Sequence, residues 1–453
     1  MEKADLIRDT IAAIATPPGA GGVGIVRLSG PRAPEILSRL FSPARRPEEF
    51  ESHRLYPGVI RDPVSGASVD EVLAVRMHAP RSYTGEEVAE IQSHGSPLIL
   101  RRIVDLAISL GARAARPGEF TERAFLSGKI DLAQAEAVAD LISARTERAR
   151  RQALEVLRGS LSAQVSALAD RLRRALAHAE VMIDFSEEDA MGPDAAAITK
   201  ELESIRGGLK ALLESYRHGK IIREGAKAVL AGAPNAGKSS LFNALLEEER
   251  AIVHEEPGTT RDRLEEWLDV QGIPVRLVDT AGLREADGVE AAGVGLARKA
   301  IEEADVLLIL ADATKPVPAE SLELLEKEKS RAIPVASKMD LPSASALPGW
   351  IPLSVRTGHG LAAIKAALAA RLSNETGEAA EGGAILTRER HRNAVAEAAR
   401  RVREATLRLS GEPAPELAAV ELRGALSALA EIAGETASED VLGLIFSEFC
   451  IGK

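Results

Sequence analysis

The stretch Gly232–Ser240, GAPNAGKSS, decides the fold of the middle of this chain. An apolar run, Val229–Ala231, precedes it, and the apolar-periodic segment Leu241–Leu245 follows it. A strand, a glycine-rich loop and a helix in this order predict a phosphate-binding loop, because the loop N–H groups and the helix N-terminus face an anion. Lys238 would reach the outer phosphates, and Ser239 would ligate Mg²⁺. A plain glycine turn is the alternative, and the complete G-x-x-x-x-G-K-S spacing disfavours it.

Length and composition bound the answer. With 453 residues the chain is too long to fold around a single hydrophobic core, so about two to four domains are expected. It has no apolar run of about 18 residues, which would be needed for a membrane span, and charges interrupt the first ten residues, unlike a signal peptide. A single cysteine, Cys450, rules out an intrachain disulfide. These features predict a cytoplasmic protein. The net charge is −11, so contact with nucleic acid would need a local basic surface or a partner.

The first part of the chain alternates short strand-like runs with helical ones. Strands are predicted over residues 9–16, 22–30, 55–60, 69–79 and 87–92, and helices over 33–41 and 98–110. This order predicts an α+β N-terminal domain over residues 1–125.

Helical patterning dominates two separate regions. The stripe from Val156 to Leu176 predicts one long amphipathic helix, and a second helix is expected over 194–218. Further helices are predicted over 387–410, 415–434 and 438–449. We therefore predict a discontinuous all-α bundle formed by residues 126–222 and 376–453, with an α/β P-loop domain of the Ras type inserted at 223–375. The segment 373–383 has the composition of a hinge.

Three motifs follow the phosphate-binding loop in the inserted domain. Gly258–Asp262 predicts a switch loop whose threonine, Thr260, closes over the γ-phosphate and completes the Mg²⁺ shell. Asp279–Gly282, DTAG, predicts a carboxylate at a strand end that holds an Mg²⁺ water. In Ser337–Asp340, SKMD, the carboxylate of Asp340 would read guanine, and the usual pattern has Asn at Ser337. The pair Ser354–Val355 stands where a last base-contacting loop belongs.

The side chain that orients the attacking water is not evident from the motifs. Leu283 follows DTAG where a glutamine or histidine is usual. The acidic candidates nearby are Glu285, Asp287 and Glu290.

Beyond these motifs, the whole chain resembles the MnmE (TrmE) family of tRNA-modification GTPases. The resemblance lies in DTIAAIATPPG, GGVGIVRLSG, SYTGEEVAEIQSHG, ARPGEFTERAFLSGKIDLAQAEAVADLI and the terminal FCIGK. It implies a folate-binding-like N-terminal domain that forms a homodimer, a helical domain and a Ras-like G domain. It also implies a flavoprotein partner, MnmG, in a heterotetramer or larger complex. The complex would act on tRNA, adding a carboxymethylaminomethyl or aminomethyl group to C5 of the wobble uridine U34 with carbon from a tetrahydrofolate derivative, away from any membrane.

The resemblance also assigns roles to particular residues. The folate contacts fall on Arg27, Glu90, Lys129 and Lys453, and the water-orienting glutamate on Glu290. Ser239 and Thr260 would hold Mg²⁺, and the K⁺ that supports G-domain pairing would be held by Asn235, His254, Glu256 and Thr259. The full set of nucleotide-binding candidates is Asn235, Ala236, Gly237, Lys238, Ser239, Ser240, His254, Glu255, Glu256, Pro257, Gly258, Thr259, Thr260, Asp279, Thr280, Ala281, Gly282, Ser337, Lys338, Asp340, Ser354 and Val355. Cys450 fits a functional thiol and a small apolar helix end equally well.

Two alternatives stay open at this point. A ribosome-assembly GTPase would share the phosphate-binding loop, GTTRD and DTAG, but it would carry a basic RNA-binding module. A dimer scaffold with a vestigial GTPase is suggested by Ser337. Arginines are frequent in residues 145–158 and 388–403, where tRNA or an acidic partner could bind, but interspersed glutamates make a solvated face at least as reasonable.

Overall fold

The computed structural model describes residues 9–45, 50–184, 195–250, 265–280, 290–376, 385–410, 413–447 and 449–453. The chain divides into two compact units. The first comprises Met1–Ala139, Val156–Ser162 and Leu429–Lys453, and the second Asp140–Glu155 and Ala163–Ala428. Each unit therefore joins segments that are distant in the sequence. The predicted domain boundaries near residues 125, 222 and 375 remain predictions.

The first unit contains a seven-stranded sheet in the order β3-β4-β5-β6-β2-β1-β7. Neighbouring strands are antiparallel except for the parallel pair β1 and β7. The strand bounds are β1 (Ile11–Ile14), β2 (Gly21–Ser29), β3 (Phe41–Pro43), β4 (Leu55–Arg61), β5 (Ser68–Met77), β6 (Val88–Gly95) and β7 (Arg113–Ala114). The five longer strands are those predicted from the sequence, and the short edge strands β3 and β7 were not.

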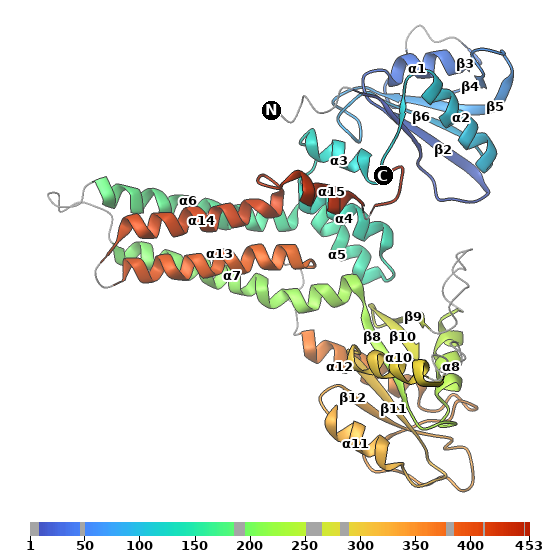
Figure 1. The fold of residues 1–453 in the computed structure, drawn as a ribbon, viewed down its shortest axis with the longest axis vertical. Coiled ribbons are helices and arrows are strands. Elements are labelled where there is room, and N and C mark those ends of the chain that lie inside the picture. The colour runs from blue at the N-terminus through green and yellow to red at the C-terminus, as the bar shows by residue number, and fades with distance from the viewer. Residues whose placement is uncertain are drawn as a thin grey trace. The chain divides into compact units, whose positions relative to one another are not determined.

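Helices cover one face of this sheet (Figure 1). Helix α1 (Ala33–Leu40) and helix α2 (Pro97–Ser109) pack on alternate strand residues such as Val26 and Leu28. The alternation of strand side chains directs Arg27, between these two, to the opposite face, where the register pairs it with Glu90. The polar group described below thus lies on the face that these helices leave open.

The end of the chain also belongs to the first unit. Helices α3 (Glu119–Leu126) and α15 (Glu439–Ser447) pack together through Phe125, Phe446 and Phe449, and the cluster includes the start of α4 (Leu132–Ser143). The backbone N–H of Phe120 donates to the carbonyl of Lys453 at 3.2 Å. The last residues are therefore fixed against α3.

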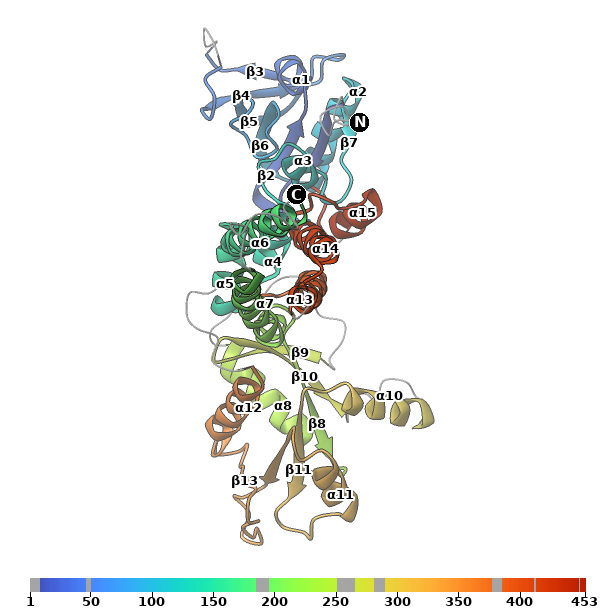
Figure 2. The same ribbon diagram turned by 90° about the vertical axis from the view of Figure 1, so that its left-hand side faces the viewer.

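The second unit contains most of the helical bundle. Its long helices come from both sides of the inserted domain: α5 (Glu147–Leu157), α6 (Ser160–Asp184), α7 (Ala195–Glu224), α13 (Glu389–Leu409) and α14 (Pro415–Ala433). Figures 1 and 2 show α6 beside α14 and α7 beside α13. The predicted discontinuous bundle is thereby confirmed.

One helix prediction was wrong. The apolar stripe from Val156 to Leu176 does not form a single helix, because Gly159 adopts a left-handed φ of 90° and ends α5 before α6 begins. Its N–H donates to the carbonyl of Val156 at 2.9 Å, a C-terminal arrangement that glycine favours. No helix within the described ranges is both long and apolar enough to cross a membrane.

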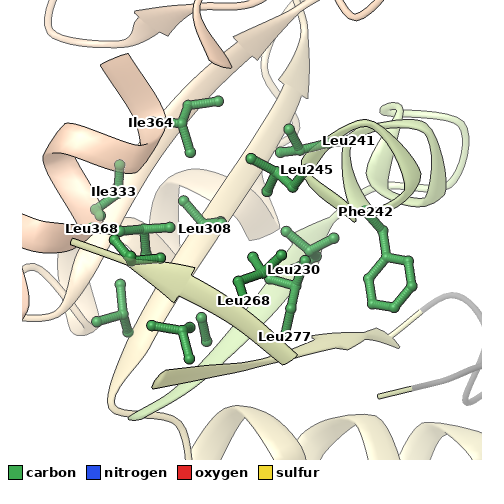
Figure 3. Packing of buried hydrophobic residues seen from close by; sticks show 14 of the residues in the cluster. Leu230, Leu241, Phe242, Leu245, Leu268, Leu277, Leu308, Ile333, Ile364 and Leu368 are labelled. Carbon is green, nitrogen blue, oxygen red and sulfur yellow. The ribbon is translucent and has the colours of Figure 1, made fainter. Parts of the chain in front are cut away.

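The G domain, meaning here β8 to α12, is also in the second unit. Its sheet has the order β13-β12-β11-β8-β10-β9, all parallel except β9. The strands are β8 (Ala226–Gly232), β9 (Glu265–Val270), β10 (Ile273–Asp279), β11 (Val306–Asp312), β12 (Ala332–Ser337) and β13 (Ile351–Pro352). Helices α8 (Lys238–Arg250) and α12 (Leu361–Thr376) cover one face around the core of Figure 3. Helices α10 (Glu290–Glu302) and α11 (Ala319–Lys327) cover the other. The predicted α/β class is confirmed.

Candidate nucleotide-binding site

The loop between β8 and α8 has a backbone that depends on special residues. Gly232, Asn235 and Gly237 have φ values of 134°, 61° and 90°. A Cβ on Gly232 would lie 2.2 Å from the carbonyl oxygen of Leu310, so only glycine fits there. Asparagine is among the few other residues that tolerate the left-handed region. The backbone curvature of the loop is therefore set by these three residues and does not depend on a bound ligand.

Lys238 starts α8 and turns its side chain back over the loop. Its Nζ donates to the carbonyls of Gly232 at 3.0 Å and Ala233 at 2.9 Å, and the side chain is buried. An ammonium held this way keeps its positive charge within the curve of the loop. A phosphate chain enclosed by that curve would be stabilised by the charge and by the dipole of α8.

Ser239 and Asp279 come together at the edge where the parallel strands end. The hydroxyl of Ser239 donates to Oδ2 of Asp279 at 2.6 Å. The adjacent Thr280 donates to the carbonyl of Leu230 at 2.7 Å, which ties the end of β10 to β8. A hydroxyl and a carboxylate are the hard oxygen donors that Mg²⁺ takes. Among the described residues no cluster of three or more His, Cys, Asp or Glu side chains could form a cage for a metal, and Mg²⁺ sites need none, since waters and phosphates complete the shell.

Ser337 fixes the predicted base-reading loop to the phosphate-binding loop. Its buried Oγ lies 2.7 Å from the carbonyl of Ala236 and 3.1 Å from that of Ala311. The hydroxyl therefore holds the end of β12 against the backbone of the phosphate-binding loop and of β11. Serine, which stands where asparagine is usual, thus links the two loops directly.

The next two side chains of the SKMD motif have different surroundings. Lys338, at φ 62°, forms an ion pair with Asp312 at 2.7 Å. Burial by itself would raise the pKa of Asp312, but hydrogen bonds from Lys338 and Thr314 outweigh it and lower the pKa to about 2. Asp340 is exposed and accepts a hydrogen bond from Ser354 at 2.9 Å. Its carboxylate is therefore oriented and accessible to a ligand.

Not every predicted residue can be placed. Asn235 and Ser240 are exposed at the loop and the first turn of α8, and Val355 packs against the G-domain core. Glu290 begins α10, and its side chain lies outside the described part of the structure. The following candidates also lie outside the described residues: His254, Glu255, Glu256, Pro257, Gly258, Thr259, Thr260, Ala281 and Gly282.

A second polar group lies on the open face of the N-terminal sheet. Arg27 Nε is 2.7 Å from Glu90 Oε1, and Nη1 of Arg27 is 3.4 Å from the carbonyl of Gly452. The guanidinium also lies 5.5 Å from the ring centre of Tyr83 and 5.6 Å from that of Phe120. Three distant parts of the sequence thus surround one arginine.

Lys453 belongs to the same group. Burial lowers the pKa of its ammonium, the nearby charge of Arg27 lowers it further, and Glu90 opposes both. Lys129, which was predicted to join the group, donates instead to the carbonyl of Pro80 at 3.2 Å. The Cys450 side chain is exposed, and its role stays a prediction.

Some residues of both sites were missed from the sequence. Asp312, the partner of Lys338, ends the strand VLLILAD, and an acidic residue closing an apolar run was the available signal. Tyr83 and Phe120 gave no signal, because their approach to Arg27 depends on tertiary packing.

The arginine-rich segments are mostly paired internally. Arg150 and Arg151 contact Glu147, and Arg400 and Arg401 contact Glu397. These helical ion pairs favour the interpretation as a solvated face over a basic nucleic-acid surface.

A glycine-constrained loop, a lysine over it, a serine–aspartate pair and an oriented, exposed carboxylate in the predicted base-reading loop are the features of a P-loop GTPase. Two family models match the chain: "GTP-binding protein TrmE N-terminus" over residues 10–129 and "MnmE helical domain" over residues 132–450. The chain belongs to the MnmE (TrmE) family of tRNA modification GTPases.

Individual relatives agree over their full length. The chain is 42% identical to "tRNA modification GTPase MnmE" of Geobacter metallireducens over 99% of this chain and 100% of the relative. The protein of the same name from Roseiflexus sp. is 44% identical with the same coverage. A crystal structure of an Aquifex aeolicus Era variant bound to GDP and AlF4⁻ overlaps 42% of this chain and 69% of that one, with 24% identity and a TM-score of 0.27. Family membership argues against the ribosome-assembly and vestigial-scaffold alternatives.

Proposed function

We propose that this protein is a K⁺-dependent GTPase that works with an MnmG-like flavoprotein. Together they would add an aminomethyl-type group, carboxymethylaminomethyl or aminomethyl, to C5 of the wobble uridine of certain tRNAs, using a tetrahydrofolate one-carbon donor. The active form would be a homodimer within a heterotetramer or larger complex in the cytoplasm. The names of the relatives support the GTPase and the tRNA substrate, and the two sites support the finer assignment.

The observation that carries the one-carbon part is the group around Arg27. Arg27 meets Glu90 and Gly452, which are 63 and 425 positions away in the sequence. A folate carries a polar pterin and an anionic glutamate tail, so one carboxylate and two cations that converge, Glu90 with Arg27 and Lys453, would suit the polar groups of such a ligand. Tyr83 and Phe120 supply flanking rings. An ordinary surface ion pair between Arg27 and Glu90 would not need a contact with Gly452 as well. The added contact therefore favours a binding site.

The phosphate site supports the GTPase part. Ser239 and Thr260 would hold Mg²⁺, and Asp279 would hold one of its waters; the ion would neutralise charge on the β- and γ-phosphates when bound. Asn235 is exposed in the loop with a left-handed backbone, where its amide oxygen could serve as a ligand for a monovalent cation. K⁺ bound there would stabilise charge that develops in the transition state.

Glu290 is the proposed water-orienting residue, because it begins the helix that follows DTAG. Glu290→Ala should bind GTP as the wild type does and hydrolyse it slowly. An unchanged rate would transfer the role to Glu285 or Asp287.

The deciding experiment is steady-state GTP hydrolysis in KCl and in NaCl at equal ionic strength, with ATP as the control. A large rate increase specific to K⁺ and GTP is expected. Equal rates in the two salts would contradict the K⁺ mechanism. For the one-carbon part, 5-formyltetrahydrofolate should bind the wild type, and Arg27→Ala should weaken it. Unchanged binding in that variant would remove Arg27 from the site.

A further inference from the structure

The tip of the β9–β10 hairpin contacts the start of helix α5, within the second unit. The Thr146 hydroxyl donates to the carbonyl of Gly272 at 2.8 Å. Gly272 lies in the tight turn between the strands, with φ values of 55° for Gln271 and 83° for Gly272. A Cβ on Gly272 would lie 3.2 Å from Cβ of Arg148. The turn therefore packs closely on the helical segment.

Two arginines of the same segment extend this contact. The guanidinium of Arg145 lies 4.5 Å from the ring centre of Trp267 in β9. Arg148 donates to Nε2 of His218 in α7 at 2.7 Å, and His218 is buried. A cation over an indole face and a part-buried, charge-assisted hydrogen bond are both interactions that fix geometry. Together with Thr146, they form what we call the hairpin clamp: Arg145, Thr146 and Arg148.

The hairpin leads directly into the nucleotide site. β10 begins at Ile273, one residue after the clamped turn, and ends at Asp279, which accepts the hydrogen bond from Ser239. Along its length β10 pairs with β8 on one side and with β9 on the other. One continuous strand of about 23 Å therefore joins Asp279 to the clamped turn.

We propose that the hairpin clamp transmits the nucleotide state of the G domain to the helical bundle. The inference rests on the proposed function, since it assigns the contact through which GTP turnover acts on tRNA modification. Its physical basis is a paired strand with a phosphate-site ligand at one end and the clamp at the other. The GDP and GTP states would differ in how firmly the turn is held, which is the differential contact that coupling requires.

Trp267 provides a direct readout. The chain has two tryptophans, so Trp350→Phe leaves Trp267 as the only indole that emits. We expect acrylamide to quench its fluorescence with a constant about twofold different between the GDP-bound protein and the protein bound to a non-hydrolysable GTP analogue. Thr146→Val and Arg148→Ala, made in this background, should abolish that difference. Equal quenching in the two nucleotide states, or a difference that survives both variants, would overturn the inference.

Matched variants separate the clamp from general damage to the helices. Thr406→Val removes a hydroxyl that bonds only within α13, and Arg150→Ala removes an arginine of α5 that pairs with Glu147. Both should keep the wild-type difference in quenching.

The consequence for the reaction is measured in the complete complex with its flavoprotein and tRNA. Thr146→Val and Arg148→Ala should hydrolyse GTP within about twofold of the wild type yet modify tRNA about fivefold more slowly, the factor of a lost hydrogen bond of ordinary strength. Wild-type modification rates in both variants would contradict the inference. If the wild type itself does not modify tRNA, the proposed function fails, while the fluorescence result still decides on the clamp.

Discussion

Replacing Ser337 by alanine should weaken both GTP and GDP without changing the preference for guanine. The Ser337 hydroxyl lies 2.7 Å from Ala236 O and 3.1 Å from Ala311 O, and it is buried. Because the hydroxyl has a single proton, which the shorter distance assigns mainly to Ala236 O, its loss leaves a buried carbonyl without this donor, at a cost of about 1–3 kcal/mol. Part of that cost lowers the stability of the protein in its nucleotide-free form as well, so we expect the loss of binding free energy to lie near the lower end of this range. About 1 kcal/mol corresponds to about fivefold.

The loss should be the same for both nucleotides because Ser337 contacts backbone of the loops and not the base. Guanine recognition would depend on Asp340, which Ser354 orients at 2.9 Å. Titration of a fluorescent GDP and GTP analogue gives the two dissociation constants, and competition with ATP gives the selectivity. Ser410→Ala, whose hydroxyl bonds only within its own helix end, is the control. Affinities within twofold of the wild type, or a selective gain in ATP binding, would refute the reasoning.

Three further predictions concern other parts of the molecule. Lys238→Ala should abolish GTP binding, because no other described side chain places a charge over the loop carbonyls. Calorimetric titration of the variant with GTP measures this, and a dissociation constant that stays micromolar would contradict it. Glu90→Gln should weaken folate while sparing GTP hydrolysis, and parallel binding and turnover assays would show it. Burial and then Arg148 lower the pKa of His218 below its ordinary 6.5, so the unfolded chain binds the proton more tightly. The stability from neutral His218 is then complete above about pH 6.5 and lost below it, and thermal midpoints of His218→Gln should vary less over pH 5.5–7.5 than those of the wild type.

The fold could be predicted where local patterns are strong. Alternation in β2 and β6, the glycine-rich loop before α8 and the period of α13 each indicated the correct element. The error at Gly159 arose because the apolar stripe continues in phase across the break, and hydrophobic spacing says nothing about a left-handed residue between two helices. The short strands β3 and β7 exist only through pairing with neighbours distant in the sequence.

In the two sites, too, residues within a contiguous motif could be predicted, and residues brought in by tertiary packing could not. The residues of the phosphate-binding loop are contiguous, so spacing alone identified Lys238 and Ser239. Asp312 and Tyr83 enter their sites through sheet order and packing, which no short motif records. The role of Ser337 could not be predicted, because the distance from its hydroxyl to Ala236 depends on how β12 lies beside β11.

The phosphate-binding loop is held from two neighbouring directions. On one side, Asp279 at the end of β10 bonds to Ser239, and Thr280 next to it bonds to Leu230 in β8, the strand that leads into the loop. On the other, the end of β12 bonds to it through Ser337 and Ala236. Because parallel strands end at one edge of the sheet, each tie is made by the last residues of a strand. If Asp340 reads the base and the hairpin clamp couples to the nucleotide, as proposed, the base would act on the loop through β12 and the hairpin turn would act on it through β10.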